Sequence, residues 1–425
     1  MRLEIQRGNA PPSGVCVSLT WAMVCVALLG PLRANDIETG SAGQEARDAG
    51  SAPRKDGSVT TLHDAYHAYI GTYTRNGSEG IYRLRFDART GDVELAGVTK
   101  GVENPSFLAL HPNGRFLYAV EETGRYEGEP TGAVSAFAID PQTGELRHLA
   151  RRPSGGSDPC HLSVAPDGSH LLVANYTGGS VARLSLALDG TFGETIVKKH
   201  DGRSVDPRRQ RGPHAHWIDF TRDGRLALAC DLGLDQVLIY DSRSGLEPSR
   251  VPFARVEPGS GPRHAAFSPT GDVLHVIGEL DSTITTFAFD AEHGLLGELG
   301  VVSTLPPSFS GSSSTAEIAV HPTRGFVYGS NRGHDSIAVF APVVDPATGR
   351  TTLRAVEIEP TGGRTPRSFG IEPGGRFLLA LNQDSSSVIV FAIDAETGAL
   401  SRTGTEIEVP MPVSIVFLPL APKGE

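Results

Sequence analysis

The chain has 425 residues, of which 50 are glycine, and its formal net charge at pH 7 is −11. This acidic balance argues against a nucleic-acid partner, because such partners are bound by clustered Lys and Arg. The many glycines are typical of a chain with numerous tight turns.

The longest apolar run of the chain occupies residues 15–32 and follows Arg2 and Arg7. A basic start, an apolar stretch and the small residue Ala34 predict a signal peptide over residues 1–34. The protein would then be exported, to the periplasm or out of the cell, with no stable membrane contact once the leader is cleaved. The alternatives are an uncleaved N-terminal anchor and, if the run is no leader, a cytoplasmic protein. The polar residues 35–64 predict a disordered linker.

A short phrase recurs along the rest of the chain: an apolar pair, a Pro or Thr, a Gly, then a second apolar run. Residues 108–118 read LALHPNGRFLY, and residues 369–379 read FGIEPGGRFLL. The turn glycines recur every 47–56 residues, at Gly114, Gly168, Gly224, Gly271, Gly325 and Gly375. A fixed period of this length is typical of a repeat architecture.

Each repeat unit predicts β structure. The apolar runs on either side of the glycine are rich in β-branched and aromatic residues, and the turn has hairpin chemistry. Third strands are expected at residues 133–139, 180–186, 236–240, 283–289, 336–340 and 387–393. A weaker fourth strand fits before the next unit. Four antiparallel strands in about 50 residues match one blade of a propeller.

A seventh unit is divided between the two ends of the domain. Residues 67–74, 80–87 and 92–98 supply three strands, and residues 413–418 resemble a first strand without its partner. Pairing the C-terminal strand with the N-terminal ones would remove an exposed sheet edge. We therefore predict an all-β fold, a seven-bladed β-propeller over residues 65–420, with the ring closed by this pairing.

The motifs of several common sites are missing from the sequence. It has no phosphate-binding glycine loop, no nucleophile elbow and no dinucleotide fingerprint. Cys16 and Cys25 lie in the leader, while Cys160 and Cys230 lie in different blades. The sequence therefore predicts neither a disulfide nor a Cys/His metal site.

Counting from the turn glycines aligns the blades. The residues eight positions before them are Ser106, Cys160, His216, Arg263, Glu317 and Arg367. The residues seven positions after them are Glu121, Asn175, Asp231, Gly278, Arg332 and Asn382. If the strand before the glycine is innermost, the first set converges on the central channel and forms a candidate site. The alternative is a polar, water-filled lining.

Two further pairs follow from the same alignment. Arg263 and Glu279 end one hairpin, so they should be neighbours, as catalytic partners or as a structural salt bridge. His214 and His216 share a strand face if the strand is regular. A metal site made of these two histidines alone is not expected, because a third ligand is missing.

Several phrases of the chain occur in the order found in one protein family. They are YIGTYT, GPHAH, DLGLD, GPRHAAF, GEL, AEIAVHP, SNRGHDSI, PRSFGI and LNQDS, between about residues 68 and 418. On these phrases the chain resembles the seven-bladed-propeller lactonases. That family includes the propeller-type 6-phosphogluconolactonases and the fungal carboxymuconate-lactonizing enzymes.

The resemblance also implies site residues. The proposed site of the muconate-lactonizing relatives holds a His, a Glu and two Arg. By motif these correspond to His214 or His216 in GPHAH, Arg263 in GPRH, Glu279 in GEL and Arg332 in SNRGH. The resemblance does not decide between the two histidines. Substrate-binding roles are expected for His264, Glu317, Arg367, Asn331 and Asn382.

The implied reaction is hydrolysis of a sugar lactone by water, without metal or cofactor. Glu279 or His216 is the expected base, while Arg263 and Arg332 would stabilise the oxyanion and hold an anionic substituent of the lactone. A phosphorylated sugar lactone of central metabolism is cytosolic, which conflicts with an exported chain. Either residues 1–34 are no leader, or the substrate is another aldonolactone or an acidic lactone. The alternatives are a muconate-type lactonizing cycloisomerase and a non-catalytic exported propeller that binds a ligand or protein at the channel mouth.

Overall fold

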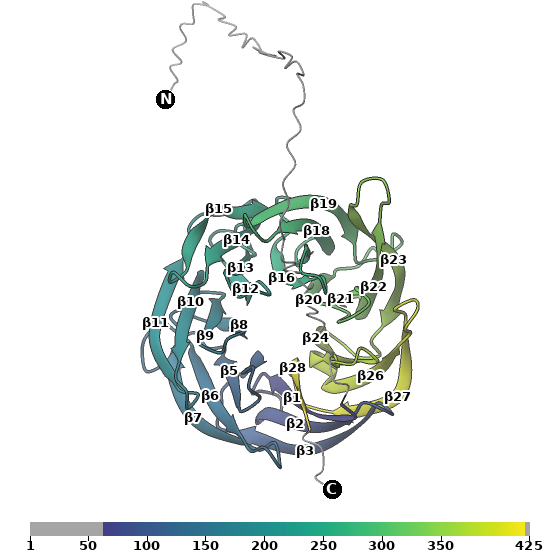
Figure 1. Cartoon of the computed structure of the whole chain (residues 1–425). Coiled ribbons are helices and arrows are strands. Elements are labelled where there is room, and N and C mark those ends of the chain that lie inside the picture. The colour runs from purple at the N-terminus through teal and green to yellow at the C-terminus, as the bar shows by residue number, and fades with distance from the viewer. Residues whose placement is uncertain (1–62, 421–425) are drawn as a thin grey trace, which may run out of the picture. The chain divides into compact units, whose positions relative to one another are not determined.

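Seven four-stranded antiparallel sheets are arranged in a ring (Figure 1). The structure, a computed structural model, describes residues 63–420. The predicted leader, and the predicted linker up to residue 62, lie outside the described residues. Within the described part, no helix is long and apolar enough to cross a membrane. The predicted fold class is confirmed: the protein is an all-β, seven-bladed propeller.

Every blade repeats the same strand order from the centre of the ring outward. The innermost strands are β4 (Leu108–Leu110), β8 (Pro159–Val164), β12 (Ala215–Phe220), β16 (Pro262–Phe267), β20 (Ser314–Val320), β24 (Pro366–Ile371) and β28 (Pro412–Pro419). The second strands are β5 (Phe116–Glu121), β9 (His170–Asn175), β13 (Leu226–Asp231), β17 (Val273–Gly278), β21 (Val327–Arg332), β25 (Phe377–Asn382) and β1 (Ala65–Thr72).

The third strands are β6 (Ala133–Ile139), β10 (Ser180–Leu186), β14 (Gln236–Asp241), β18 (Thr283–Asp290), β22 (Ser336–Val344), β26 (Ser387–Ile393) and β2 (Gly80–Asp87). The outer strands are β7 (Leu146–Pro153), β11 (Phe192–Lys199), β15 (Glu247–Arg255), β19 (Leu295–Ser303), β23 (Thr351–Pro360), β27 (Leu400–Glu408) and β3 (Asp92–Lys100). A single 3₁₀ turn, η1 (Gln383–Ser385), follows β25. All six predicted third strands are found, with ends that agree or extend by one to four residues.

The ring closes as expected. The C-terminal strand β28 pairs antiparallel with β1, and Tyr66 lies opposite Pro419. The blade that contains both chain ends therefore has the order β28-β1-β2-β3. The six turn glycines have φ between +65° and +80°, the left-handed conformation in which glycine has no steric cost.

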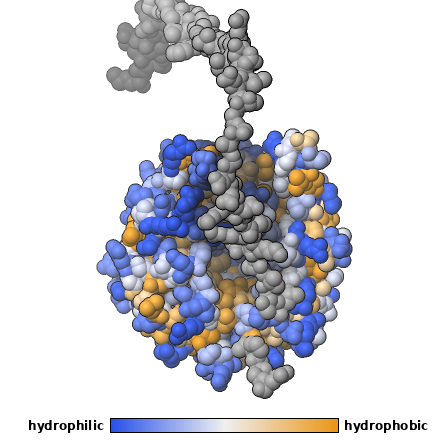
Figure 2. Space-filling model, in the orientation of Figure 1, coloured by the Kyte–Doolittle hydropathy of each residue, from blue (hydrophilic) through white to orange (hydrophobic). Residues whose placement is uncertain are grey.

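The core lies between neighbouring blades. The second strands, which have packed neighbours on both faces, are almost entirely buried, whereas the outer strands are mostly exposed. Phe86 of β2, for example, meets Phe377 of the adjacent blade edge-on, with ring centroids 5.7 Å apart. The rim of the face shown in Figure 2 carries mostly hydrophilic residues with scattered hydrophobic ones, as expected for outer strands in water.

Three equivalent tyrosines form hydrogen bonds from one blade to the next. The hydroxyls of Tyr69, Tyr118 and Tyr328, all on second strands, donate to carbonyls of Gly144, Gly190 and Gly398 at distances of 2.8, 3.1 and 2.9 Å. Each acceptor lies in the outer turn of the following blade. These bonds satisfy the buried hydroxyls, and they fix the angle between blades.

Buried histidines predict acid sensitivity of the fold. Burial lowers the pKa of His67, His170 and His275 to about 4. The unfolded chain, with histidine pKa near 6.5, binds more protons as the pH falls, so stability is full above about pH 6.5 and is lost toward pH 4. Each group can contribute up to about 1.4 kcal/mol per pH unit in that window. Urea unfolding at pH 8, 6 and 4.5 measures this slope.

The variant His275→Asn is the control for the pH dependence. It removes one of the buried histidines that titrate in this window and should make the slope between pH 6.5 and 4 shallower. A free energy of unfolding that stays constant over this range in the parent protein contradicts the expectation.

Candidate functional site

Six of the seven innermost strands have a β-bulge at the same place. In β16, Pro262 pairs with Gly278 and His264 pairs with Ile277, which leaves Arg263 without a partner residue. The register shifts in the same way at Cys160, His216, Arg367 and Val413, and across Ala316 and Glu317 of β20. A bulge turns its side chain out of the regular alternation and is frequent beside active sites.

The bulged side chains surround one small cavity on the ring axis, with a volume of about 10 Å³, which is room for about one water molecule. All six residues of the column that precedes the turn glycines line it. The full lining is Tyr73, Ser106, Phe107, Glu122, Cys160, His216, Arg263, His264, Glu317, Arg367 and Val413. The structure thus brings together residues from every blade, as the glycine spacing predicts.

Aromatic side chains fill the centre of the ring beside this cavity. Phe107 and His264 come from blades on opposite sides of the ring, yet their ring centroids lie 5.9 Å apart. His161 contacts both, with centroids 4.1 Å from Phe107 and 5.2 Å from His264. The side chains therefore meet across the axis at this level, and Phe107 and His264 form a floor to the cavity.

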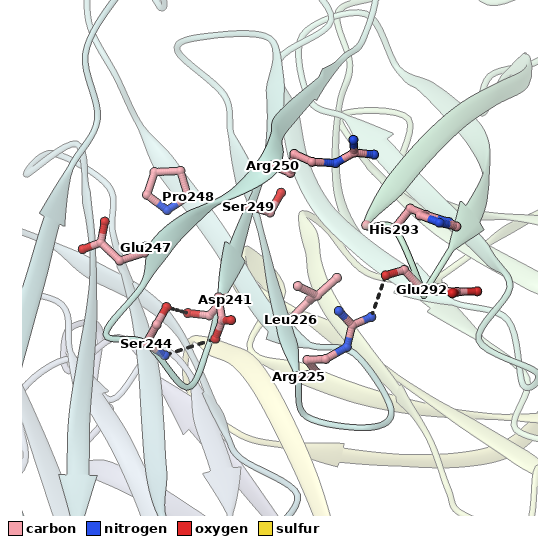
Figure 3. A pocket seen from close by; sticks show the side chains of 11 residues that line it. Arg225, Leu226, Asp241, Ser244, Glu247, Pro248, Ser249, Arg250, Glu292 and His293 are labelled. Atoms are coloured by element: carbon pink, nitrogen blue, oxygen red, sulfur yellow. Dashed lines mark hydrogen bonds between the residues drawn. The ribbon is translucent and has the colours of Figure 1, made fainter.

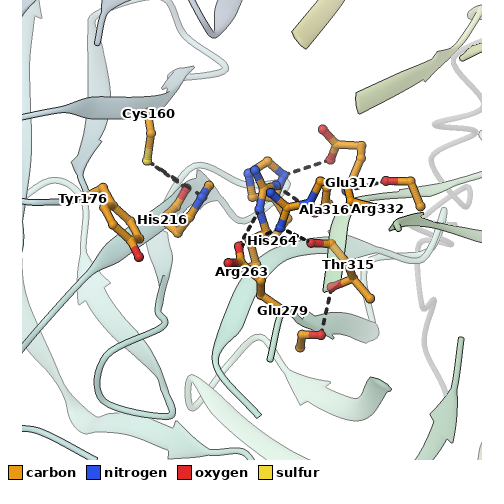
Figure 4. A network of polar contacts seen from close by, with 12 residues as sticks. Cys160, Tyr176, His216, Arg263, His264, Glu279, Thr315, Ala316, Glu317 and Arg332 are labelled. Carbon is orange, nitrogen blue, oxygen red and sulfur yellow. Dashed lines mark hydrogen bonds and ion pairs between the residues drawn. The ribbon is translucent and has the colours of Figure 1, made fainter. Parts of the chain in front are cut away.

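Glu279 lies just after β17 and joins three arginines from different elements. Its Oε1 is 2.6 Å from Arg209 Nη2. Its Oε2 is 3.1 Å from both Arg263 Nε and Arg332 Nη2, and these three residues are labelled in Figure 4. Arg263 also donates to the carbonyl of Ala316 at 2.8 Å. The predicted contact between Arg263 and Glu279 is present in the structure.

The charges of this cluster fix its protonation states. Burial alone would raise the pKa of Glu279, but Arg332, Arg263 and Arg209 together lower it to about 2. Burial lowers the pKa of Arg332 to about 9, which still leaves it a cation at neutral pH. A carboxylate with so low a pKa is a weak proton acceptor at pH 7. The cluster therefore fits a fixed electrostatic anchor better than a general base.

Arg367 lies on the other side of the cavity. Its guanidinium carbon is 5.3 Å from the ring centroid of Tyr73, whose hydroxyl donates to both carboxylate oxygens of Glu122 at 3.0 Å. Ser106 donates to the same carboxylate. Burial alone would lower the pKa of Arg367, but Tyr73, Glu122 and Glu279 together raise it. Arg367 lines the cavity, and among residues 63–420 no side chain forms an ion pair or hydrogen bond with it.

The two candidate histidines have different places. His216 lines the cavity, with Nδ1 3.8 Å from the Cys160 sulfur, and burial lowers its pKa well below the usual range. His214 is stacked on Tyr176 with centroids 4.6 Å apart, and its Nδ1 is 3.1 Å from the Tyr176 carbonyl oxygen, outside the cavity lining.

The position of the two histidines gives a simple prediction. His216→Gln should lower kcat/KM by at least about tenfold, equal to the loss of one contact of about 1.4 kcal/mol. His214→Gln should leave kcat/KM close to that of the parent, because the His214 imidazole contacts Tyr176 and does not line the cavity. Steady-state kinetics of both variants on a lactone substrate measures the difference. A larger loss of kcat/KM in His214→Gln than in His216→Gln would show that His214 is the site residue.

Asn331 and Asn382 are fully buried between strands and do not line the cavity. The Asn331 amide donates to the Thr304 carbonyl at 2.9 Å, and its carbonyl accepts from the Thr304 hydroxyl at 2.6 Å. Asn382 contacts Ser387 in the equivalent place of the last blade. Both residues therefore have a structural role between strands, and the site proposed below does not include them. The spacing from the turn glycines could not exclude these two residues, because the ends of the second strands lie near the same rim as the cavity residues.

Arg209 is a residue of the site that the alignment of the blades on their turn glycines does not identify. It comes from the long segment 200–214 between β11 and β12, and it bridges the Tyr176 hydroxyl at 3.1 Å and Glu279. The segment is held by Gln210, whose amide donates to Asp235 at 2.8 Å. The signal in the sequence is an unusually long inter-blade segment with four arginines, at Arg203, Arg208, Arg209 and Arg211.

A wider hollow lies at the outer edge of the ring, between the turns of two blades (Figure 3). It is lined by solvated charged residues such as Glu247, Arg250 and Glu292, and Arg225 donates there to the Glu292 carbonyl at 3.3 Å. No group of three or more His, Cys, Asp or Glu placed to hold a metal ion occurs in the described part of the chain. The cavity on the axis, with its buried cations and imidazoles, is the better candidate site.

Known proteins match the part of the chain that forms the propeller. The family model described as "Lactonase, 7-bladed beta-propeller" matches residues 67–417. A 6-phosphogluconolactonase of Bacillus subtilis is 35% identical over 356 residues, covering 83% of this chain and 98% of that protein. A 6-phosphogluconolactonase of Formosa agariphila is 30% identical over 355 residues, covering 80% and 96%. The solved structure of a periplasmic gluconolactonase from Pseudomonas aeruginosa is 34% identical, with a TM-score of 0.77, covering 84% and 100%.

Proposed function

The chain belongs to the seven-bladed β-propeller lactonase family, and from this premise we propose that it hydrolyses a sugar lactone bound where the cavity on the ring axis opens to solvent. The observation that carries the proposal is the lining of that cavity. Two arginines and two imidazoles from three blades line it, and all of them except Arg367 are buried. Lactone opening needs fixed positive charge for the oxyanion and a neutral base for water, and the cavity holds both kinds of group.

The arginines have separate tasks in this proposal. Arg263 and Arg367 line the cavity and stabilise the negative charge that develops on the carbonyl oxygen. Glu279 fixes Arg263 and Arg332 in place, so that little reorganisation is needed when the charge forms. Arg332 is assigned to this supporting cluster and no longer to direct oxyanion contact, because it is absent from the cavity lining.

The charge balance of the site favours an anionic lactone. Four arginines of the site face three carboxylates, although the chain as a whole is acidic. Arg209, with a side chain that is 40% exposed, lies at the solvent side of the cluster. A phosphate or carboxylate on the sugar would accept forked hydrogen bonds from such a guanidinium. We therefore propose a small anionic aldonolactone as substrate.

The test is a titration assay at constant pH. The purified protein is offered glucono-1,5-lactone and its 6-phosphate, and acid release is compared with the spontaneous rate. Faster hydrolysis of both, with a higher kcat/KM for the phosphate, is the expected result. No acceleration of either lactone overturns the function, and turnover of a muconate instead would favour the cycloisomerase alternative.

We also propose that the protein is exported, from the leader-like residues 1–34. A periplasmic relative supports this, although other relatives carry the name of the phosphorylated substrate. N-terminal sequencing of the mature protein from separated cell fractions is the measurement. A chain that retains Met1 in the cytosolic fraction contradicts export.

A further inference from the structure

A His–Glu pair connects two adjacent blades at the floor of the cavity. His264 Nδ1 of β16 is 2.9 Å from Glu317 Oε1 of β20 (Figure 4). Glu317 is itself held, since its Oε1 accepts from the backbone N–H of Ile318 at 3.1 Å and its Oε2 from the Ser368 hydroxyl at 3.0 Å. A carboxylate with all these donors has one stable position, so it fixes the plane and the tautomer of the imidazole.

The second nitrogen of this imidazole is unused. An ionised carboxylate only accepts hydrogen bonds, so the proton of neutral His264 is on Nδ1 and Nε2 carries the lone pair. His264 Nε2 is buried and has no hydrogen-bond partner among residues 63–420. His264 is also one of the residues that line the cavity. A buried acceptor without a partner is costly in a folded protein, and it is expected where a ligand or a reacting water completes it.

The surroundings keep His264 neutral at pH 7. Burial lowers its pKa, Arg263 adds to this, and Glu317 opposes it. Arg367 acts in the same direction as Arg263. The titratable and charged groups that face the imidazole are Glu317 of β20, Arg263 of β16, Arg367 of β24, His216 of β12 and His161 of β8. A neutral imidazole beside two cations can accept a proton, and its conjugate acid is stabilised by Glu317.

The other candidate bases lack this arrangement. Glu279 is committed to three arginines. Glu122 accepts from Tyr73 and Ser106. His216 Nδ1 contacts the Cys160 thiol at 3.8 Å, and within the described chain no carboxylate forms a hydrogen bond with that imidazole. An oriented base with a free nitrogen is the pattern of nucleophile activation in hydrolases.

We propose that His264 is the general base of the lactonase reaction and that Glu317 is its positioning residue. The inference rests on the hydrolytic function proposed above. His264 Nε2 takes a proton from water while the water oxygen bonds to the lactone carbonyl carbon, and the carbonyl π electrons move onto its oxygen. When this tetrahedral intermediate collapses, the ring C–O bond breaks and the leaving oxygen takes the proton back from Nε2. One lactone and one water give one hydroxy acid.

The first test is His264→Gln, with His275→Gln as the control. His275 is also buried, but it bonds Thr286 inside a blade and does not line the cavity. His264→Gln should lower kcat by about 10²–10⁴-fold with little change in KM, as for loss of a general base. His275→Gln should keep the parent kcat. Near-parent kcat in His264→Gln overturns the proposal, and no activity in the parent protein overturns the lactonase function instead.

The second test uses Glu317→Gln and the pH profile of kcat/KM. Glu317 raises the pKa of His264, so its removal should move the acid limb of the profile to lower pH and reduce the plateau. A merely structural role would lower the plateau and leave the limb in place, which overturns the assignment of Glu317. If His264→Gln does not fold, this shift carries the proposal, because it requires His264 to be the titrating group.

Discussion

The variant Glu279→Gln is expected to unfold with a free energy about 3–5 kcal/mol lower than that of the parent, as when one partner of a buried ion pair is removed. Glu279 is 5% exposed and is the carboxylate shared by Arg209, Arg263 and Arg332. Gln keeps the shape of the side chain but leaves two buried guanidinium groups without a counter-charge. Urea unfolding at pH 7 measures the difference.

The control for this change is Glu247→Gln. Glu247 pairs with Lys198 at 2.7 Å, but its side chain is 62% exposed, so its loss should cost less than about 1 kcal/mol. The pH dependence gives a second check. The folded pKa of Glu279 is about 2 and the unfolded value is near 4.3, so its stabilisation is present above about pH 4.3 and is lost toward pH 2. The gap between variant and parent should shrink in that window, and an equal effect of both variants at pH 7 contradicts the expectation.

The fold follows from the sequence because its strongest signal is local and repeated. A glycine in a hairpin turn must have positive φ, and six such turns at nearly equal spacing identify six blades, while strands from the two chain ends supply the seventh. The same spacing identifies the channel column, since residues at one distance from the turn occupy one level of the ring. The β-bulge at that level was not visible in the sequence, because a bulge depends on pairing with the next strand.

The electrostatics of the site is harder to predict. Arg209 reaches Glu279 from a different blade connection, 70 residues earlier in the chain, and no period relates the two. The contact between His264 and Glu317 also crosses a blade boundary. From the sequence alone Glu279 is a candidate base, because its three guanidinium neighbours, which lower its pKa, are not visible there. The protonation states of Glu279 and His264 depend on contacts between blades, whereas the sequence repeat predicts only which residues are neighbours within one blade.

Arg367→Ala is expected to lower kcat/KM by about 10²–10³-fold, the usual cost of removing one oxyanion donor. Its guanidinium lines the cavity, and in the described part of the chain no carboxylate is paired with it. Arg367→Lys keeps the charge but loses the planar fork, so its loss should be smaller but clear. Steady-state kinetics on glucono-1,5-lactone and its 6-phosphate measures both variants. Arg89→Ala, at an exposed surface pair with Asp87, serves as the control.

The two lactones separate the possible partners of Arg367. The oxyanion forms on the carbonyl oxygen of both substrates, whereas only one of them carries a phosphate. If Arg367 stabilises the oxyanion, Arg367→Ala lowers kcat/KM by the same factor for both lactones, and the effect is on kcat. If it holds the phosphate, the loss is confined to the phosphorylated lactone. The shared cavity favours the first outcome: the Tyr73 ring packs 5.3 Å from the guanidinium carbon of Arg367, and both residues line the cavity that His264 also lines, where it would activate the water.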